Sequence, residues 1–258
     1  MPAKFRIALL AGLFCLFFAA SLRANDVSVE EADAEIVITM RAELCPDPKD
    51  NPDTEAAEGP TVEQVQQFLE AHLENIRRIW NACTRTFRMG KGRPAKPVRF
   101  VFDITVIEDC DQERDPDRKR IKVHLGKPPP ESRKKADTEN LWIEETTSKN
   151  FAHELGHSMG LGEEYKYNGG PTRQNLMGRG ENETVLAYHI TTIIFTNAGN
   201  PDRAESQRRA TMKTCLRMKD QKLARQIAAQ NGINDAQYDA YKEIFTANNS
   251  EIQPEAPQ

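Results

Sequence analysis

The sequence predicts an α+β protein in which a long helix backs a mixed, twisted sheet, with a second helix after the strands and a helical C-terminal part. Residues 35–40 and 98–107 are rich in β-branched and aromatic residues, which is typical of strands. Between these strands, apolar residues recur at helical spacing from Val65 to Cys83. Residues 203–230 and 235–248 carry Ala, Lys, Arg and Gln in patterns that favour two further helices.

The first 24 residues have the organisation of an export signal. A basic start is followed by an apolar stretch over residues 7–20 and by small residues around Ser21 and Ala24. The apolar stretch is shorter than the roughly 20 residues that a spanning helix needs. We therefore expect cleavage, a secreted or periplasmic location, and no stable membrane insertion. The remaining residues 25–258 are predicted to form one domain, with a core over about 35–195 and a helical extension over 196–250.

Charge excludes one class of function. The chain has 39 acidic and 35 basic residues, a net charge of -4, and loss of the signal removes three cations and no acid. Nucleic-acid binding needs clustered positive charge, so we exclude it.

The predicted elements can be justified in order. Residues 25–34 are polar and acidic and are expected to be a flexible lead-in. Thr61 and Gln64 form a capping-box pattern at the start of the long helix, and His72 lies near its apolar stripe, which predicts a packing role. Residues 119–125 alternate basic and apolar residues, which suits an edge strand; His124 could face a substrate groove, and the default expectation is that it faces solvent.

The second half of the chain is predicted to be mainly helical. Residues 141–143 form a short strand, and the hydroxyls of Thr146, Thr147 and Ser148 precede a helix that begins near Asn150. Residues 175–178 are typical of a tight turn, and residues 183–196 of a buried helix.

Four cysteines follow the signal: Cys45, Cys83, Cys110 and Cys215. An even number in an exported chain favours two disulfides, and three pairings are open. Without a CxxC spacing a thiolate zinc site is not expected. Cys45 could alternatively block a metal ion in a latent form of the protein.

One helix carries the chemistry. His153 and His157 are four residues apart, so both imidazoles project from one helix face and can bind a single zinc ion. Glu154 lies beside them and is the candidate general base for a water molecule activated by the metal. Gly160 lets the helix end and the chain turn back, which brings Glu163 and Glu164 forward as candidate third ligands.

The run from His153 to Glu163 fits H-E-x-x-H-x-x-G-x-x-E and resembles the zincin metallopeptidases, in particular the metzincins. It is also similar to the HEFGH-x-x-GLGDEY signature of bacterial secreted zincin-like peptidases. The resemblance implies a zincin-like fold over about residues 35–195, zinc bound by His153, His157 and Glu163, and Met177 in a turn beneath the metal. Metzincins usually supply His or Asp where this chain has Glu163, so the resemblance leaves the choice between Glu163 and Glu164 open.

The leading hypothesis is therefore a zinc-dependent endopeptidase that acts on protein or peptide substrates, with Glu154 as the base. Tyr165, Tyr167 and His189 are candidate donors to the oxyanion, and each is equally compatible with a packing role. Two alternatives remain: an exported binding module that is stabilised by a metal and cuts nothing, and a zinc amidase that acts on cell-wall peptides.

Overall fold

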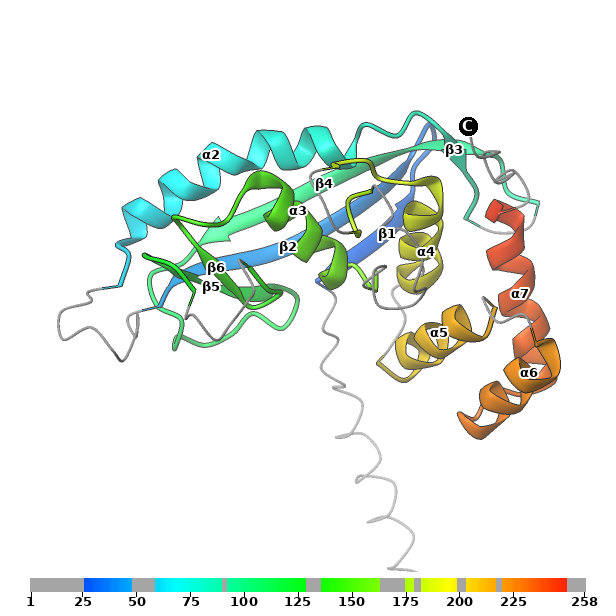
Figure 1. Ribbon diagram of the computed structural model, residues 1–258. Helices are drawn as coiled ribbons and strands as arrows, with labels where there is room; N and C mark the ends of the chain where they lie inside the picture. Colours follow the sequence, from blue (N-terminus) through cyan, green and yellow to red (C-terminus); the bar gives the residue numbers. More distant parts are fainter. Residues whose placement is uncertain are drawn as a thin grey trace, which may run out of the picture.

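A computed structural model describes residues 26–47, 59–89, 92–128, 136–162, 175–178, 182–198, 203–216 and 220–249. Over these residues the protein is a mixed α+β structure, as the sequence predicts, built on a six-stranded sheet in the order β3-β4-β2-β5-β6 with β1 also paired to β2 (Figure 1). The strands are β1 (Val27–Glu31), β2 (Ile36–Pro46), β3 (Thr86–Phe87), β4 (Lys96–Val106), β5 (Lys119–His124) and β6 (Asn140–Trp142). The helices are α2 (Val62–Trp80), α3 (Ser148–Ser158), α4 (Ala187–Asn197), α5 (Arg203–Leu216), α6 (Gln221–Gln230) and α7 (Asp235–Asn249).

Strand β2 organises the sheet because three other strands pair with it. It runs parallel to β4 on one side, while β1 and β5 share its other side, with β1 antiparallel to the first half and β5 parallel to the second. Strand β6 extends the parallel part beyond β5. The chain enters α3 shortly after β6, so the parallel strands place the start of that helix.

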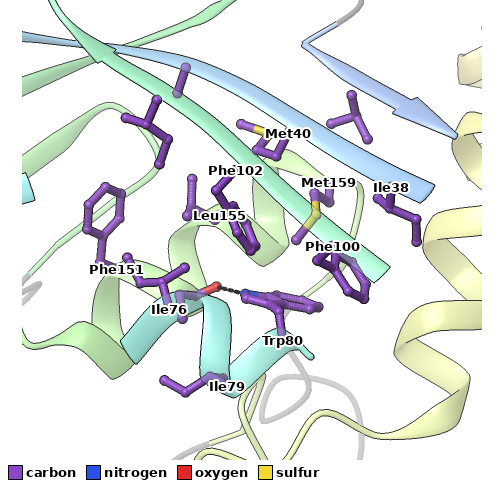
Figure 2. Close-up of a cluster of buried hydrophobic side chains, with 14 of the residues drawn as sticks. Ile38, Met40, Ile76, Ile79, Trp80, Phe100, Phe102, Phe151, Leu155 and Met159 are labelled. Carbon is purple, nitrogen blue, oxygen red and sulfur yellow. Dashed lines mark hydrogen bonds between the residues drawn. The ribbon is translucent and has the colours of Figure 1, made fainter. Parts of the chain in front are cut away.

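Helices α2 and α3 enclose the main core against β2 and β4. Figure 2 shows Ile76 and Trp80 of α2 and Leu155 of α3 converging with Phe100 and Phe102 of β4. These five side chains are all buried. The alternation of inward residues along β4 is the period of two that a strand imposes. Helix α2 begins as predicted, with a complete capping box between Thr61 and Gln64.

A second, smaller core joins the C-terminal helices. Phe195 of α4 makes edge-to-face contacts with Tyr241 and Phe245 of α7. Met212 and Cys215 of α5 are buried in the same cluster. The helical extension is therefore packed onto α4. Among the residues that the structure describes, no helix combines the length and apolar character needed to cross a membrane.

Three expectations about elements were wrong. Residues 27–31 form strand β1 instead of a flexible lead-in, since Val27 and Val29 are buried and the strand pairs with residues 36–40 of β2. Residues 203–230 are not one helix, because α5 ends at Leu216 and α6 begins anew after Asp220, whose carboxylate caps it. The third concerns β5, which lies between β2 and β6 and is not an edge strand.

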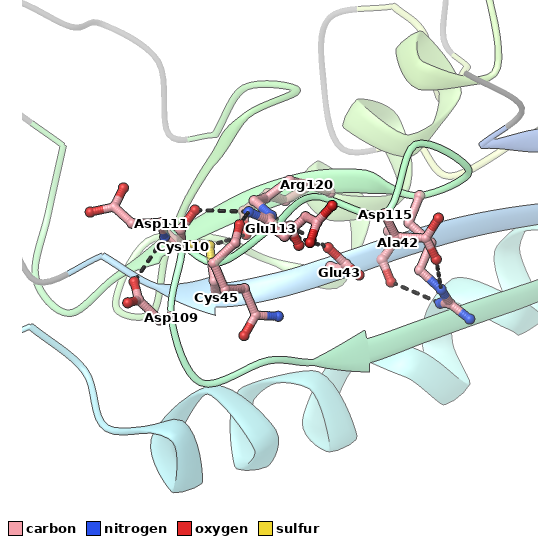
Figure 3. A network of polar contacts seen from close by, with 12 residues as sticks. Ala42, Glu43, Cys45, Asp109, Cys110, Asp111, Glu113, Asp115 and Arg120 are labelled. Atoms are coloured by element: carbon pink, nitrogen blue, oxygen red, sulfur yellow. Dashed lines mark hydrogen bonds and ion pairs between the residues drawn. A yellow bond between two sulfur atoms is a disulfide. The ribbon is translucent and has the colours of Figure 1, made fainter. Parts of the chain in front are cut away.

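The basic residues of β5 are tolerated inside the sheet because each forms an ion pair with a nearby carboxylate. Arg120 forms an ion pair with the buried Glu43 at 3.0 Å. Its guanidinium also donates to the carbonyl oxygens of Cys110 at 2.9 Å and Gln112 at 2.6 Å (Figure 3). A charge that is buried with a partner and several acceptors avoids the cost of an unpaired ion.

The disulfide expectation is confirmed for one pair only. Cys45 and Cys110 form a disulfide that links the end of β2 to the crossover between β4 and β5 (Figure 3). Cys83 and Cys215 are free thiols, so the second expected disulfide is absent from the described part of the chain. Because its sulfur is bonded to Cys110, Cys45 is not the thiolate that a latent metal site would need.

Candidate metal centre

Helix α3 is held in place by its cap and its apolar face. Thr147 is the N-cap and accepts a hydrogen bond from the amide of Asn150, as the hydroxyl-rich sequence predicts. Phe151 and Leu155 are fully buried in the main core. The indole of Trp80 donates to the carbonyl oxygen of Ala152 at 3.2 Å, which ties α3 to α2 (Figure 2). These contacts fix which face of α3 points away from the sheet.

His153, Glu154 and His157 meet on that face, as the spacing predicts. One ligand atom from each lies within 4.8 Å of the others, and all three residues are half-buried. The Nε2 atoms of the two histidines are 3.0 Å apart, and their rings are perpendicular. The sequence motif therefore becomes a compact cluster of two imidazole nitrogens and a carboxylate.

The other nitrogen of each ring is committed to the backbone. Nδ1 of His153 donates to the carbonyl oxygen of Leu176 at 2.8 Å, and Nδ1 of His157 donates to that of Leu161 at 3.0 Å. A carbonyl oxygen only accepts, so each Nδ1 must carry the proton. In the neutral ring this leaves a lone pair on Nε2, oriented by the bond on the far side, which is the usual arrangement of a metal-binding histidine.

The donor set fits a zinc ion. Two lone pairs facing each other at 3.0 Å repel, and either a shared proton or a bound metal ion between them removes the repulsion. Tetrahedral zinc with Zn–N bonds of about 2.0–2.1 Å separates two ligand nitrogens by roughly 3.3–3.4 Å, close to the observed spacing. Imidazole nitrogen is among the ligands that zinc takes. The third predicted ligand, Glu163, and its alternative, Glu164, lie outside the described residues.

The predicted turn at residues 175–178 packs directly beneath α3. The amide of Gly178 donates to the carbonyl oxygen of Asn175, and the side-chain oxygen of Asn175 accepts from the amide of Met177. Met177 is fully buried under Gly156, where an added Cβ would approach its sulfur to 2.7 Å. Gly156 thus permits the close approach that brings the Leu176 carbonyl to His153.

A Schellman motif ends α3 and provides a hydrogen-bond acceptor for His157. The amide of Leu161 donates to the carbonyl oxygen of Gly156, and the amide of Gly160 donates to that of His157. Gly160 has a φ of 94°, which a residue with a Cβ rarely adopts. The turn leaves the Leu161 carbonyl positioned to accept from His157 Nδ1. Neither backbone carbonyl was foreseen from the sequence, although both turns that present them were.

The remaining histidines have other partners. Nδ1 of His72 is 2.8 Å from Ser148 Oγ, in keeping with the predicted packing role. His124 is half-buried and stacks on Trp142, so the expectation that it faces solvent was wrong. His189 is buried, and its Nδ1 accepts from the amide of Leu186 while its Nε2 lies 2.9 Å from Tyr188 Oη.

His189 therefore has a structural use in capping α4. The other two candidate oxyanion donors, Tyr165 and Tyr167, lie outside the described residues, as does the predicted signal segment.

No protein-family model matches the chain, and no significant similarity to a curated protein or to a solved structure is found. The site must consequently be interpreted from its own geometry.

Proposed function

We propose that the protein is an exported zinc-dependent endopeptidase whose metal is bound by His153, His157 and Glu163. The observation that carries this proposal is the pair of Nε2 atoms 3.0 Å apart, each on a ring whose Nδ1 donates to a backbone carbonyl. The two carbonyl bonds fix both tautomers so that the Nε2 atoms face each other. Two separate turns, at Leu161 and at Leu176, supply the carbonyl oxygens that orient the rings.

The resemblance to the zincins adds support in two places. The buried turn at Met177 lies beneath the histidine-bearing helix, where the metzincin resemblance implies it. The helix also follows β6, the last strand of a mostly parallel sheet.

Each part of the cluster has a chemical role in the proposed reaction. When bound, zinc would lower the pKa of a water molecule to about 7 and polarise the substrate carbonyl. The two histidines supply neutral nitrogen ligands, because their protons stay on Nδ1. Glu154 accepts the proton that the attacking water loses and passes it to the leaving nitrogen. Glu154 lies in the cluster, but the motif assigns the ligand positions to other residues. A carboxylate that is close to the metal without being a ligand favours catalysis over a purely structural metal site.

The decisive experiment compares three forms of the chain that begins at Asn25: the unaltered protein, Glu154→Gln, and Glu144→Gln as a control. Glu144 is an exposed carboxylate just before α3, so its substitution makes the same chemical change away from the cluster. Zinc binding is measured by calorimetry, and cleavage is measured on an unfolded protein and on cell-wall peptide fragments.

We expect Glu154→Gln to retain zinc and to lose cleavage by about 10²–10⁴-fold, the usual contribution of a general base. The Glu144→Gln variant should cleave as the unaltered protein does. Cleavage of cell-wall fragments alone would replace the peptidase with an amidase. A zinc-loaded protein that cuts neither substrate would leave the non-catalytic binding module, and full activity in Glu154→Gln would remove Glu154 from the mechanism.

A further inference from the structure

Helix α5 carries a polar stripe that connects the C-terminal helices to the metal-binding helix. Glu205, Arg209 and Lys213 are spaced four residues apart, so they lie on one face of α5. This face looks toward the C-terminal ends of α3 and α4, since Lys213 bonds to the Gly160 carbonyl and Arg209 to those of Phe195 and Ala198. The helical extension, to which the motif assigns no role, therefore reaches the turn that ends the histidine-bearing helix.

Lys213 makes the contact nearest to the centre. Its Nζ donates to the carbonyl oxygen of Gly160 at 2.6 Å. The side chain of Asn197, at the end of α4, donates to the adjacent carbonyl oxygen of Met159 at 3.1 Å. An ammonium group at a helix C-terminus is favoured by the helix dipole and forms a charge-assisted hydrogen bond. The turn that ends α3 is thus held from outside by two side chains.

The rest of the stripe fixes α5 itself. Arg209 donates to the carbonyl oxygens of Phe195 and Ala198, at the end of α4. Glu205 accepts from Arg209 at 2.8 Å and from the hydroxyl of Tyr241 at 2.7 Å. Burial raises the pKa of Glu205, but the hydrogen bonds from Tyr241 and the arginines outweigh it and lower the pKa overall, so the carboxylate stays ionised.

We propose that Lys213 is a positioning residue for the zinc ligand His157, acting through the Gly160–Leu161 turn. Lys213 holds the Gly160 carbonyl, and the next carbonyl along the chain, that of Leu161, accepts the proton-bearing Nδ1 of His157. Loss of the lysine frees the turn, and His157 loses the bond that orients its Nε2. This inference rests on the proposed zinc function.

The test is the zinc affinity of the metal-free protein, measured by competition with a chromophoric chelator, together with the visible spectrum of the cobalt(II) form. Lys213→Met removes the donor and keeps the bulk of the stem. Lys213→Arg restores a cationic donor. Lys222→Met, at an exposed site on α6, makes the same charge change away from the turn. Circular dichroism checks that each variant is folded.

We expect Lys213→Met to bind zinc about 10-fold more weakly, as observed when a group that orients a metal ligand is removed, and to shift the cobalt spectrum. Lys213→Arg should recover most of the affinity, and Lys222→Met should match the unaltered protein. If Lys213→Met does not fold, the shorter, uncharged Lys213→Gln takes its place with the same expectation.

The outcomes separate the two proposals. Equal zinc affinity and an unchanged cobalt spectrum in the Lys213 variants would overturn the positioning role while the proposed zinc peptidase stands. Equal losses in Lys213→Met and Lys222→Met would overturn it as well, because the effect would then be one of net charge. If the unaltered protein binds no zinc, the proposed function fails, and the positioning role fails with it.

Discussion

Substitution of Gly156 by alanine tests the packing of the turn beneath the histidine-bearing helix α3. An ideal Cβ at this position would lie 2.7 Å from Met177 Sδ, 3.2 Å from Met177 Cε and 3.2 Å from Trp80 Cζ2. The first distance is shorter than real Cβ contacts, so Met177 has to move. Because Met177 follows Leu176, whose carbonyl holds His153, the displacement should also reach the metal centre.

Two opposing effects set the magnitude. Alanine is favoured over glycine inside a helix by about 1 kcal/mol, whereas overpacking of a dense core costs about 1–3 kcal/mol. We expect a net destabilisation of about 1 kcal/mol, measured by urea denaturation, and a fall in Tm of about 2–4 °C. Zinc affinity should fall in the same variant.

A double-mutant cycle isolates the cause. Met177→Ala removes the two Met177 atoms that the new methyl group would meet and leaves only Trp80 Cζ2, so the cost of Gly156→Ala should fall by about 1 kcal/mol or more in that background. Gly126→Ala is the control, since nothing lies within 4 Å of its added Cβ, and it should change stability by less than about 0.5 kcal/mol. An equal cost of Gly156→Ala in both backgrounds would refute the assigned contact.

Two further predictions concern stability away from the cluster. Burial lowers the pKa of His72, so the unfolded chain binds the proton more readily and stability is lost as pH falls below about 6.5. His72→Gln should flatten this pH dependence of stability, measured by urea titration with chelator present. An unchanged slope of stability against pH would contradict the prediction. Replacing Cys45 and Cys110 together by alanine should cost roughly 2–4 kcal/mol, and reductant should bring the unaltered protein to the same stability. Cys83→Ser, at a free thiol, should change it little, and a comparable loss there would argue against the assigned pair.

Local signals in the sequence sufficed for several elements. The capping box at Thr61 was predicted, and the N-cap Thr147 was one of three neighbouring hydroxyl residues proposed, because a cap is formed by residues that are neighbours in the chain. The same holds for the placement of His153, Glu154 and His157 on one helix face, which follows from helical spacing alone. Gly160 was assigned to a turn for the same reason, since its positive φ is a local requirement.

Pairings between distant residues could not be predicted in this way. Strand β1 is short and ends in two acidic residues, and it is a strand because it pairs with residues 36–40 of β2. The basic residues of β5 suggested an edge, and only the sheet brought Glu43 and the crossover carbonyls to Arg120. The choice of Cys110 as the partner of Cys45 depends on the same crossover.

By itself, the sequence determined which side chains are candidate metal ligands, because ligand type and helical spacing can both be read from nearby residues. Only the tertiary structure decided what orients them: the carbonyls of Leu176 and Leu161, the glycine that admits Met177, and the reach of Lys213 from α5. The physical reason is that backbone carbonyls are the same at every residue. Their role depends on the direction in which the fold points them, and that direction is set by contacts between segments far apart in the chain.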